Sequence, residues 1–309
     1  MNEEPQTPKK SFCNDSLFDK KFVKTYSPSH ITGFFEICDN KNPLYKGSIG
    51  CGIVLEAGCV TEVSLCNNLS VKVQIKINGR AEEANTTKYV VEHLAGMSEV
   101  EVSTNFEVPV GCGFGASGAG ALSTAFALNE LLSLDMTVNE VAQIAHCAEV
   151  ENSTGLGDVI AETYGGVVIR KKPGPPGIGV IDRIPHRNEK ISYVALGKKS
   201  TKTVLREGGG ELKRRINEAG REAMKALMRK PTLETFMRAS REFSLRIELI
   251  SDACKDAIEA VDAEGEVASV AMLGETVFVI GDSEALSEFG EVKESRIADV
   301  GANIIGILH

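Results

Sequence analysis

One glycine-rich stretch of the sequence, residues 109–122, has the composition and spacing to bind a phosphate group. It opens as a loop and continues without interruption into the mostly apolar, helix-forming residues 119–132. The first N–H groups of a helix have no partner inside it, and the helix dipole places partial positive charge there, so such a loop predicts an anion site. Gly111, Gly113 and Gly115 would let the backbone direct its N–H groups towards one point and leave room for a bulky phosphate.

Two widespread phosphate-binding patterns fit this stretch poorly. A P-loop needs a lysine after its second glycine, and Ala119 stands at that position. The dinucleotide pattern G-x-G-x-x-G is matched by residues 113–118, but a lone match carries little information. The preceding residues 100–108 alternate between apolar and polar, which is typical of a half-buried strand and not of a strand inside a parallel sheet. The acidic residue expected further on would be Asp135, which lies at a predicted helix end and not at the tip of a second strand.

Written as Pro-x-Gly-x-Gly-Phe-Gly-x-Ser-Gly-Ala, the stretch resembles the second motif of the GHMP kinases, the family of galactokinase, homoserine kinase, mevalonate kinase and phosphomevalonate kinase. This motif is longer and more specific than either alternative, and a glycine-rich turn that only packs a buried helix on a sheet is the remaining interpretation. The resemblance implies an α+β, two-domain GHMP kinase fold, with an N-terminal ribosomal-protein-S5-like nucleotide-binding domain and a C-terminal ferredoxin-like split β-α-β domain. It also implies that ATP is bound by Pro109, Gly111, Gly113, Phe114, Gly115, Ala116, Ser117, Gly118 and Ala119.

Two acidic residues downstream of the loop resemble the carboxylate pair of this family. Glu149 lies near the end of a predicted helix, and Asp158 follows a break at Gly155; Glu151 is a weaker choice for the first acid. Phosphoryl transfer needs positioning and charge neutralisation more than covalent chemistry. We therefore expect Glu149 and the Ser117 hydroxyl to bind Mg²⁺, and Asp158 to orient the acceptor hydroxyl and take its proton. Asp158, Ser117 and Glu149 are the candidate catalytic residues, and a solvated acid and a helix cap are the plain alternatives for the two carboxylates.

Two further stretches resemble one branch of the family, the archaeal pantoate kinases. In residues 27–35, Ser29 and His30 replace the glycine and the basic residue common in other GHMP kinases, and residues 169–179 form the second matching stretch. The resemblance implies ATP-dependent phosphorylation of pantoate to 4-phosphopantoate on the archaeal route to coenzyme A. His30 and Arg170 are the candidate substrate-binding residues, because a guanidinium can hold the carboxylate of a hydroxy acid with two hydrogen bonds. A kinase for mevalonate, homoserine or shikimate, and a nucleotide or metabolite sensor without catalysis, stay open as alternatives.

The overall composition limits the partners. A formal net charge of −9 argues against nucleic acid, which would require a basic surface. No apolar run approaches the roughly 20 residues that a membrane span needs. The eight cysteines are scattered and no secretory signal is recognisable, so we expect reduced thiols in a cytoplasmic enzyme. The expected partners are pantoate and ATP, with a homodimer as a compatible assembly.

The order of predicted elements indicates where the chain divides. We expect a flexible extension at residues 1–21, an ATP-binding domain at 22–172, a linker rich in proline and glycine at 173–189, and an α+β domain at 190–309. The third motif of the family, a glycine-rich loop between strands, is reduced here to residues 271–275 with one glycine. How this loop meets the phosphate does not follow from the sequence.

Overall fold

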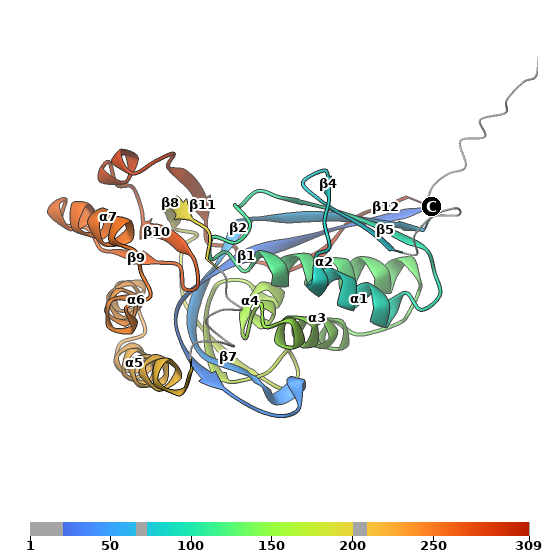
Figure 1. Ribbon diagram of the computed structural model, residues 1–309, viewed down its shortest axis with the longest axis horizontal. Coiled ribbons are helices and arrows are strands. Elements are labelled where there is room, and N and C mark those ends of the chain that lie inside the picture. Colours follow the sequence, from blue (N-terminus) through green and yellow to red (C-terminus); the bar gives the residue numbers. More distant parts are fainter. Residues whose placement is uncertain (1–20, 66–72, 200–208, 309) are drawn as a thin grey trace, which may run out of the picture.

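The structure is a computed structural model that describes residues 21–65, 73–199 and 209–308 (Figure 1). The extension predicted at residues 1–21 therefore lies, except for its last residue, outside the described residues. Runs of strands and runs of helices follow one another along the chain, and two sheets divide the strands between them. No helix of the described ranges is both long and apolar enough to cross a membrane.

The first sheet carries the N-terminal half of the chain and the last strand. Its strands follow the order β12-β1-β2-β5-β3-β4, and β6 extends from β2 to pair with β7. The frame is a long antiparallel hairpin in which Phe22 pairs with Ser64 and Cys38 pairs with Gly47. Helices α1, α2 and α4 contact one face of this sheet and α3 packs on these helices, with the core between the layers (Figure 1). The elements are β1 (Phe22–Cys38), β2 (Gly47–Leu65), β3 (Val73–Ile77), β4 (Arg80–Ala81), α1 (Asn85–Leu94), β5 (Val100–Phe106), α2 (Ala116–Leu131), α3 (Val138–Asn152), α4 (Asp158–Tyr164), β6 (Val167–Lys172), β7 (Val180–Ile184), β12 (Asn303–Leu308) and the 3-10 turn η1 (Pro43–Tyr45).

The second sheet is smaller and antiparallel, in the order β11-β8-β10-β9. Three amphipathic helices lie on the same side of the molecule as this sheet (Figure 1). Phe34 and Phe35 of β1 pack with tilted rings against Phe236 and Phe243 of these helices, so one core joins the two halves. The elements are β8 (Lys190–Gly197), α5 (Gly209–Arg229), α6 (Leu233–Ile247), α7 (Asp252–Ala263), β9 (Ala268–Val270), β10 (Glu275–Ile280), β11 (Lys293–Arg296) and the 3-10 turn η3 (Ala285–Glu288).

The predicted α+β class is confirmed, and several local predictions hold to within a few residues. The strand before the glycine-rich loop is β5, and the predicted break separates α3 from α4. The structure also shows that a capping box of Thr137 and Glu140 starts α3. Strand, helices, two strands, a 3-10 turn and a strand follow one another in the second sheet, as expected for a split β-α-β arrangement.

Two strands, β7 and β12, belong to the first sheet although the predicted segments placed them outside the first domain. The predicted linker at 173–189 contains β7, which pairs with β6 and so belongs to the first sheet. The last strand, β12, pairs with the start of β1 and not with the second sheet, although the sequence placed it in the 190–309 domain. The strand β7 follows its partner β6 after the proline- and glycine-rich residues 173–179, whose composition had suggested a linker. The strand β12 is short and its partner β1 lies at the other end of the chain, so nothing local assigned it to a sheet.

Candidate active site

The glycine-rich loop joins β5 to α2 and leaves the N-terminus of α2 open. Gly111, Gly113 and Gly115 have φ values of +86°, +97° and +62°, a region that side chains rarely adopt. Gly115 occupies the N-cap position, and no side chain caps the helix there. The first N–H groups of α2 are therefore available to an anion, at the positive end of the helix dipole.

The loop is supported from behind by the turn between β9 and β10. A Cβ atom on Gly274 would overlap the carbonyl oxygen of Cys112 and lie 2.5 Å from the backbone nitrogen of Gly113, so only glycine fits. The Thr276 hydroxyl donates to the same carbonyl at 2.7 Å, and the backbone N–H of Lys199 donates to the carbonyl of Gly111 at 3.0 Å. The third motif therefore acts through its single glycine as a support for the loop, and its other residues need not be glycine.

A buried chain of three polar side chains meets beside the loop. His30 of β1 is fully buried, and its Nδ1 atom lies 2.8 Å from Oδ1 of Asp158, the first residue of α4. Its Nε2 atom lies 3.4 Å from a terminal nitrogen of Arg170, which comes from β6 and is 1% exposed. Because arginine can only donate, Nε2 must accept and Nδ1 must carry the proton that is donated to Asp158. The geometry thus assigns a neutral His30 with a defined tautomer.

Electrostatics agree with this assignment. Burial lowers the pKa of His30, and the hydrogen bond and charge of Asp158 only partly oppose the effect. Burial by itself would raise the pKa of Asp158, but the hydrogen bond from His30 and the positive charge of Arg170 outweigh it, and the pKa lies below its ordinary value. Asp158 is therefore ionised at neutral pH, with one oxygen engaged by His30.

Glu149 lies close to Asp158 but in a drier environment. It is 2% exposed, its Oε1 atom accepts from the Thr154 hydroxyl at 2.6 Å, and its Oε2 atom has no partner among the described residues. A Cβ atom on Gly155 would overlap this oxygen and lie 2.8 Å from Oδ2 of Asp158, so the two carboxylates approach one another at this glycine. Burial and the charge of Asp158 raise the pKa of Glu149 to about 8, against the opposing hydroxyls of Thr154 and Ser117.

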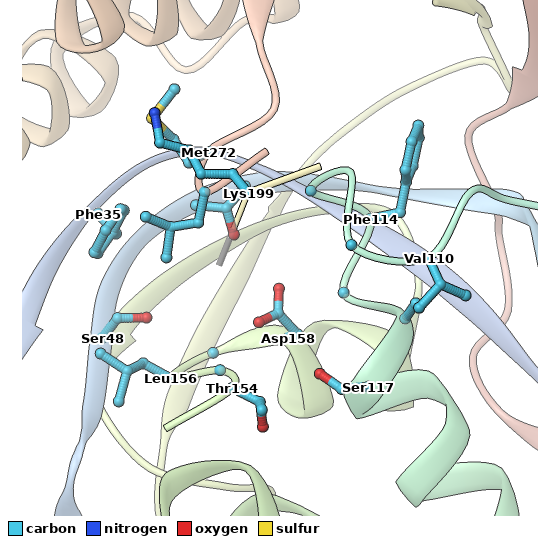
Figure 2. A pocket seen from close by; sticks show the side chains of 18 of the residues that line it. Phe35, Ser48, Val110, Phe114, Ser117, Thr154, Leu156, Asp158, Lys199 and Met272 are labelled. Atoms are coloured by element: carbon cyan, nitrogen blue, oxygen red, sulfur yellow. The ribbon is translucent and has the colours of Figure 1, made fainter. Parts of the chain in front are cut away.

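A cavity of about 360 Å³ opens between the loop and the second half of the chain. Figure 2 shows Ser117 and Val110 on one side of Asp158, and Phe35, Ser48 and Leu156 on the other. The loop side carries the helix N-terminus with its backbone N–H groups, and the opposite wall combines the apolar Phe35 and Leu156 with the polar Ser48. An anion at the helix N-terminus and a small organic molecule against the wall would meet at Asp158.

Comparisons with known proteins agree on the family. The model of the GHMP kinase N-terminal domain matches residues 84–166. The pantoate kinase of Thermococcus kodakarensis is 36% identical over 85% of this chain and 89% of its own length. The chain belongs to the pantoate kinase family. The pantoate kinase of Methanocaldococcus jannaschii is similarly related, with 37% identity over 85% of this chain and 94% of its own length.

Solved structures extend the agreement to the fold. A phosphotransferase related to the coenzyme A biosynthesis pathway is 31% identical, with a TM-score of 0.82 over 92% of this chain and 98% of that one. The homoserine kinase of Cytophaga hutchinsonii, at 16% identity and a TM-score of 0.66, shares the fold alone. The predicted two-domain GHMP kinase fold is confirmed, and the chain is a small-molecule kinase of the pantoate kinase family.

The structure of this pantoate kinase family member gathers most of the predicted site residues around the cavity. Ser117 and Asp158 point into the cavity. His30 and Glu149 lie directly behind its lining, where His30 contacts Asp158 and Glu149 adjoins Gly155. Glu151, the weaker choice for the first acid, is exposed at the end of α3. The predicted residues that line the cavity are Gly111, Gly113, Phe114, Gly115, Ala116, Ser117, Asp158 and Arg170, and those that do not are Pro109, Gly118, Ala119, Glu149 and His30.

Sequence reasoning missed two groups of residues. Glu162 is fully buried one turn after Asp158, and a Cβ atom on Gly115 would lie 2.5 Å from one of its oxygens. Neither oxygen has a partner among the described residues, and burial next to Asp158 and Glu149 raises its pKa well above the ordinary range. The i, i+4 spacing from Asp158 could have indicated it. The cavity wall of Phe35, Leu156 and Met272 carried no such signal, because its members come from three distant segments.

Proposed function

We propose that the protein transfers the γ-phosphoryl group of ATP to the 4-hydroxyl group of pantoate and forms 4-phosphopantoate. The observation that carries this proposal is the position of Asp158, ionised and held by His30, between the open N-terminus of α2 and a small cavity with an apolar wall. Such an arrangement brings a phosphate, a base and a hydroxyl group into line.

Asp158 acts as the base. His30 donates to Oδ1, which leaves Oδ2 to accept the proton of the pantoate hydroxyl while its oxygen forms the bond to the γ-phosphorus. The bond between the γ-phosphorus and the bridging oxygen breaks, and ADP leaves with that electron pair. His30 stays neutral throughout and orients the carboxylate, because its second nitrogen is occupied by Arg170.

The loop and the first turn of α2 bind the ATP phosphates. The positive φ values of the loop glycines direct backbone N–H groups towards the cavity, and the absence of a side-chain cap on α2 keeps that position free. Glycine is required at Gly115 in particular, since Glu162 already fills the space behind it. Backbone amides stand where a P-loop would supply its lysine, and Lys199 lines the same cavity.

Glu149 and Ser117 are the residues that would hold Mg²⁺. Their fit to a hard cation rests on the Oε2 atom of Glu149, which is buried without a partner and would gain one in the ion. In the described residues no group of three or more acidic, histidine or cysteine side chains could hold a metal, and Mg²⁺ needs only one or two carboxylates beside phosphate oxygens and water. When bound, the ion neutralises charge on the phosphates.

The opposite wall of the cavity suits pantoate. In pantoate the carbon that carries the reacting hydroxyl is attached to a carbon with two methyl groups, so an apolar surface must lie next to the base. Phe35, Leu156 and Met272 provide that surface. Arg170 is proposed to bind the substrate carboxylate, since its Nε atom is buried without a partner and adjoins the hydroxyl of Ser48 across Gly157.

A coupled ADP-release assay tests the proposal, with ATP and Mg²⁺ against pantoate, pantothenate, mevalonate, homoserine and shikimate. We expect turnover on pantoate, and the Asp158→Asn variant measured in parallel should show none above about 1% of it. Turnover on another alcohol in the panel would keep the mechanism and discard the substrate. A protein that binds ATP and turns over none of the five alcohols would refute the assigned reaction.

A further inference from the structure

The cavity beside the glycine-rich loop has few basic side chains for a ligand as highly charged as ATP. Loop residues 109–119 include neither lysine nor arginine. Among the described residues that line the cavity, Arg170 and Lys199 are the basic ones. Arg170 adjoins Gly157 and contacts His30, and the proposed mechanism gives it the substrate carboxylate. Lys199 is therefore the basic side chain of the lining that this mechanism leaves without a role.

Lys199 starts from a position that the loop itself fixes. It follows β8, and its backbone N–H donates to the carbonyl oxygen of Gly111 at 3.0 Å. Its side chain is half-buried, and Figure 2 shows it on the opposite side of Asp158 from Ser117. The N-terminus of α2 therefore meets the cavity from one side, and Lys199 meets it from the other.

The ammonium group of Lys199 has a weak partner. It donates to the carbonyl oxygen of Leu249, two residues after the end of α6. No carboxylate of the described residues pairs with it. A lysine ammonium has three N–H donors and a full charge, whereas a carbonyl oxygen carries only a partial one. An anion that enters the cavity therefore competes with a single neutral oxygen and gains a charge-assisted hydrogen bond.

We infer that Lys199 binds the γ-phosphoryl group of ATP during its transfer, and that it supplies from the second half of the chain the cation that the glycine-rich loop lacks. The inference rests on the proposed phosphoryl transfer and adds a residue that contacts the reacting group. As the γ-phosphorus passes from ADP to the alcohol, negative charge spreads over its three outer oxygens. The N–H groups of α2 stabilise this charge from one side, and the ammonium group, released from Leu249, stabilises it from the other. Lys199 keeps its protons and forms no bond to phosphorus.

The carboxylate of pantoate is the alternative anion for Lys199. The connection to the loop favours the phosphoryl group, because the hydrogen bond to Gly111 places Lys199 next to the phosphate-binding backbone. Arg170 lies elsewhere in the lining, next to Gly157 at the start of α4, and its planar guanidinium suits a carboxylate better than an ammonium does. Each of the two anions thus has its own basic side chain.

Calorimetric titration with ADP and with a non-hydrolysable ATP analogue, both with Mg²⁺, tests the contact without any acceptor alcohol. We expect Lys199→Met to weaken binding of the analogue about 10- to 100-fold and binding of ADP less than about threefold. In the pantoate assay the same variant should lower kcat about 10²- to 10³-fold, with the KM for pantoate nearly unchanged. Lys199→Arg, which keeps the charge, should recover most of the affinity for the analogue.

Lys198→Met is the matched control. Lys198 carries the same charge one residue earlier, is exposed, and does not line the cavity. Its variant should keep kcat and the affinity for both nucleotides. Equal losses in the Lys198 and Lys199 variants would mean that the charge of the segment matters and not a contact of Lys199, and would overturn the inference. A raised KM for pantoate with unchanged binding of the analogue would overturn it in favour of the substrate carboxylate.

Chemical modification of the unaltered protein supplies a measurement that does not depend on a variant folding. Acetic anhydride acetylates free lysine side chains, and tandem mass spectrometry of the peptides measures the rate at each lysine. The ATP analogue should slow acetylation of Lys199 more than ADP does, and Lys198 should react alike with either nucleotide. Equal protection of Lys199 by both would refute its contact with the γ-phosphoryl group. If the unaltered protein turned over none of the alcohols, the proposed reaction would fall, while the comparison of the two nucleotides would still decide this contact.

Discussion

Replacing Glu149 by glutamine should stabilise the metal-free protein and impair the enzyme. In the folded state the pKa of this carboxyl is raised from an ordinary value of 4.5 to about 8. A group of this kind contributes stability that is fully present below pH 4.5 and is lost as the pH rises towards 8. Glutamine has the same shape and no charge, and it can still accept from the Thr154 hydroxyl, so it escapes that loss.

The magnitude follows from the difference between the two pKa values. About 1.4 kcal/mol per pH unit, applied from 4.5 upwards, gives about 3 kcal/mol at pH 7 and about 5 kcal/mol above pH 8. Because Glu149 is 2% exposed, solvent screening removes little of this. The free energy of unfolding of Glu149→Gln should therefore exceed that of the unaltered protein by these amounts, and the two should agree near pH 4.5.

Urea unfolding between pH 5 and 8.5, without Mg²⁺ and followed by circular dichroism because the chain contains no tryptophan, measures the difference. Glu151→Gln, an exposed acid on the same helix, is the control and should leave the pH dependence unchanged. Adding Mg²⁺ and ATP should reverse the order, because only the unaltered protein gains the stability of the bound ion. If the unfolding free energies of Glu149→Gln and the unaltered protein differ by the same amount at every pH in this range, the pKa of Glu149 is not raised by burial. The reasoning would then fail.

Three further substitutions test the site. Asp158→Asn should lower kcat by about 10²- to 10⁴-fold with the KM for ATP nearly unchanged, and a variant with full steady-state activity would exclude Asp158 as the base. Arg170→Lys should raise the KM for pantoate about 10- to 100-fold, because an ammonium cannot reproduce the two-pronged contact; equal losses for pantoate and ATP would argue against a substrate role. Gly274→Ala should cost at least about 1–3 kcal/mol in urea unfolding and weaken ATP binding, because its Cβ meets the backbone of Cys112; Gly210→Ala, with open space around it, is the control.

Local sequence determined the elements that carry the site. Glycines at φ values that side chains avoid, followed by helix-forming residues, define the loop and the start of α2. The capping box at Thr137 defines where α3 starts, and therefore which face of the helix carries Glu149 near its end. These features depend on interactions within a few residues of one another, which is why the sequence predicts them. The family resemblance added the chemistry of Asp158 and Ser117, and the roles of the site residues remain predictions.

Tertiary structure alone decided which side chains meet. His30 and Asp158 are 128 residues apart, and their hydrogen bond exists because β1 and α4 pack side by side. The fit of Gly274 to the loop and the return of β12 to β1 likewise depend on how distant strands pair. Burial, which sets the charge states of His30 and Glu149, depends on the whole core closing around them. Local patterns specify elements, whereas long-range packing specifies contacts and local dielectric, and the chemistry of this site depends on both.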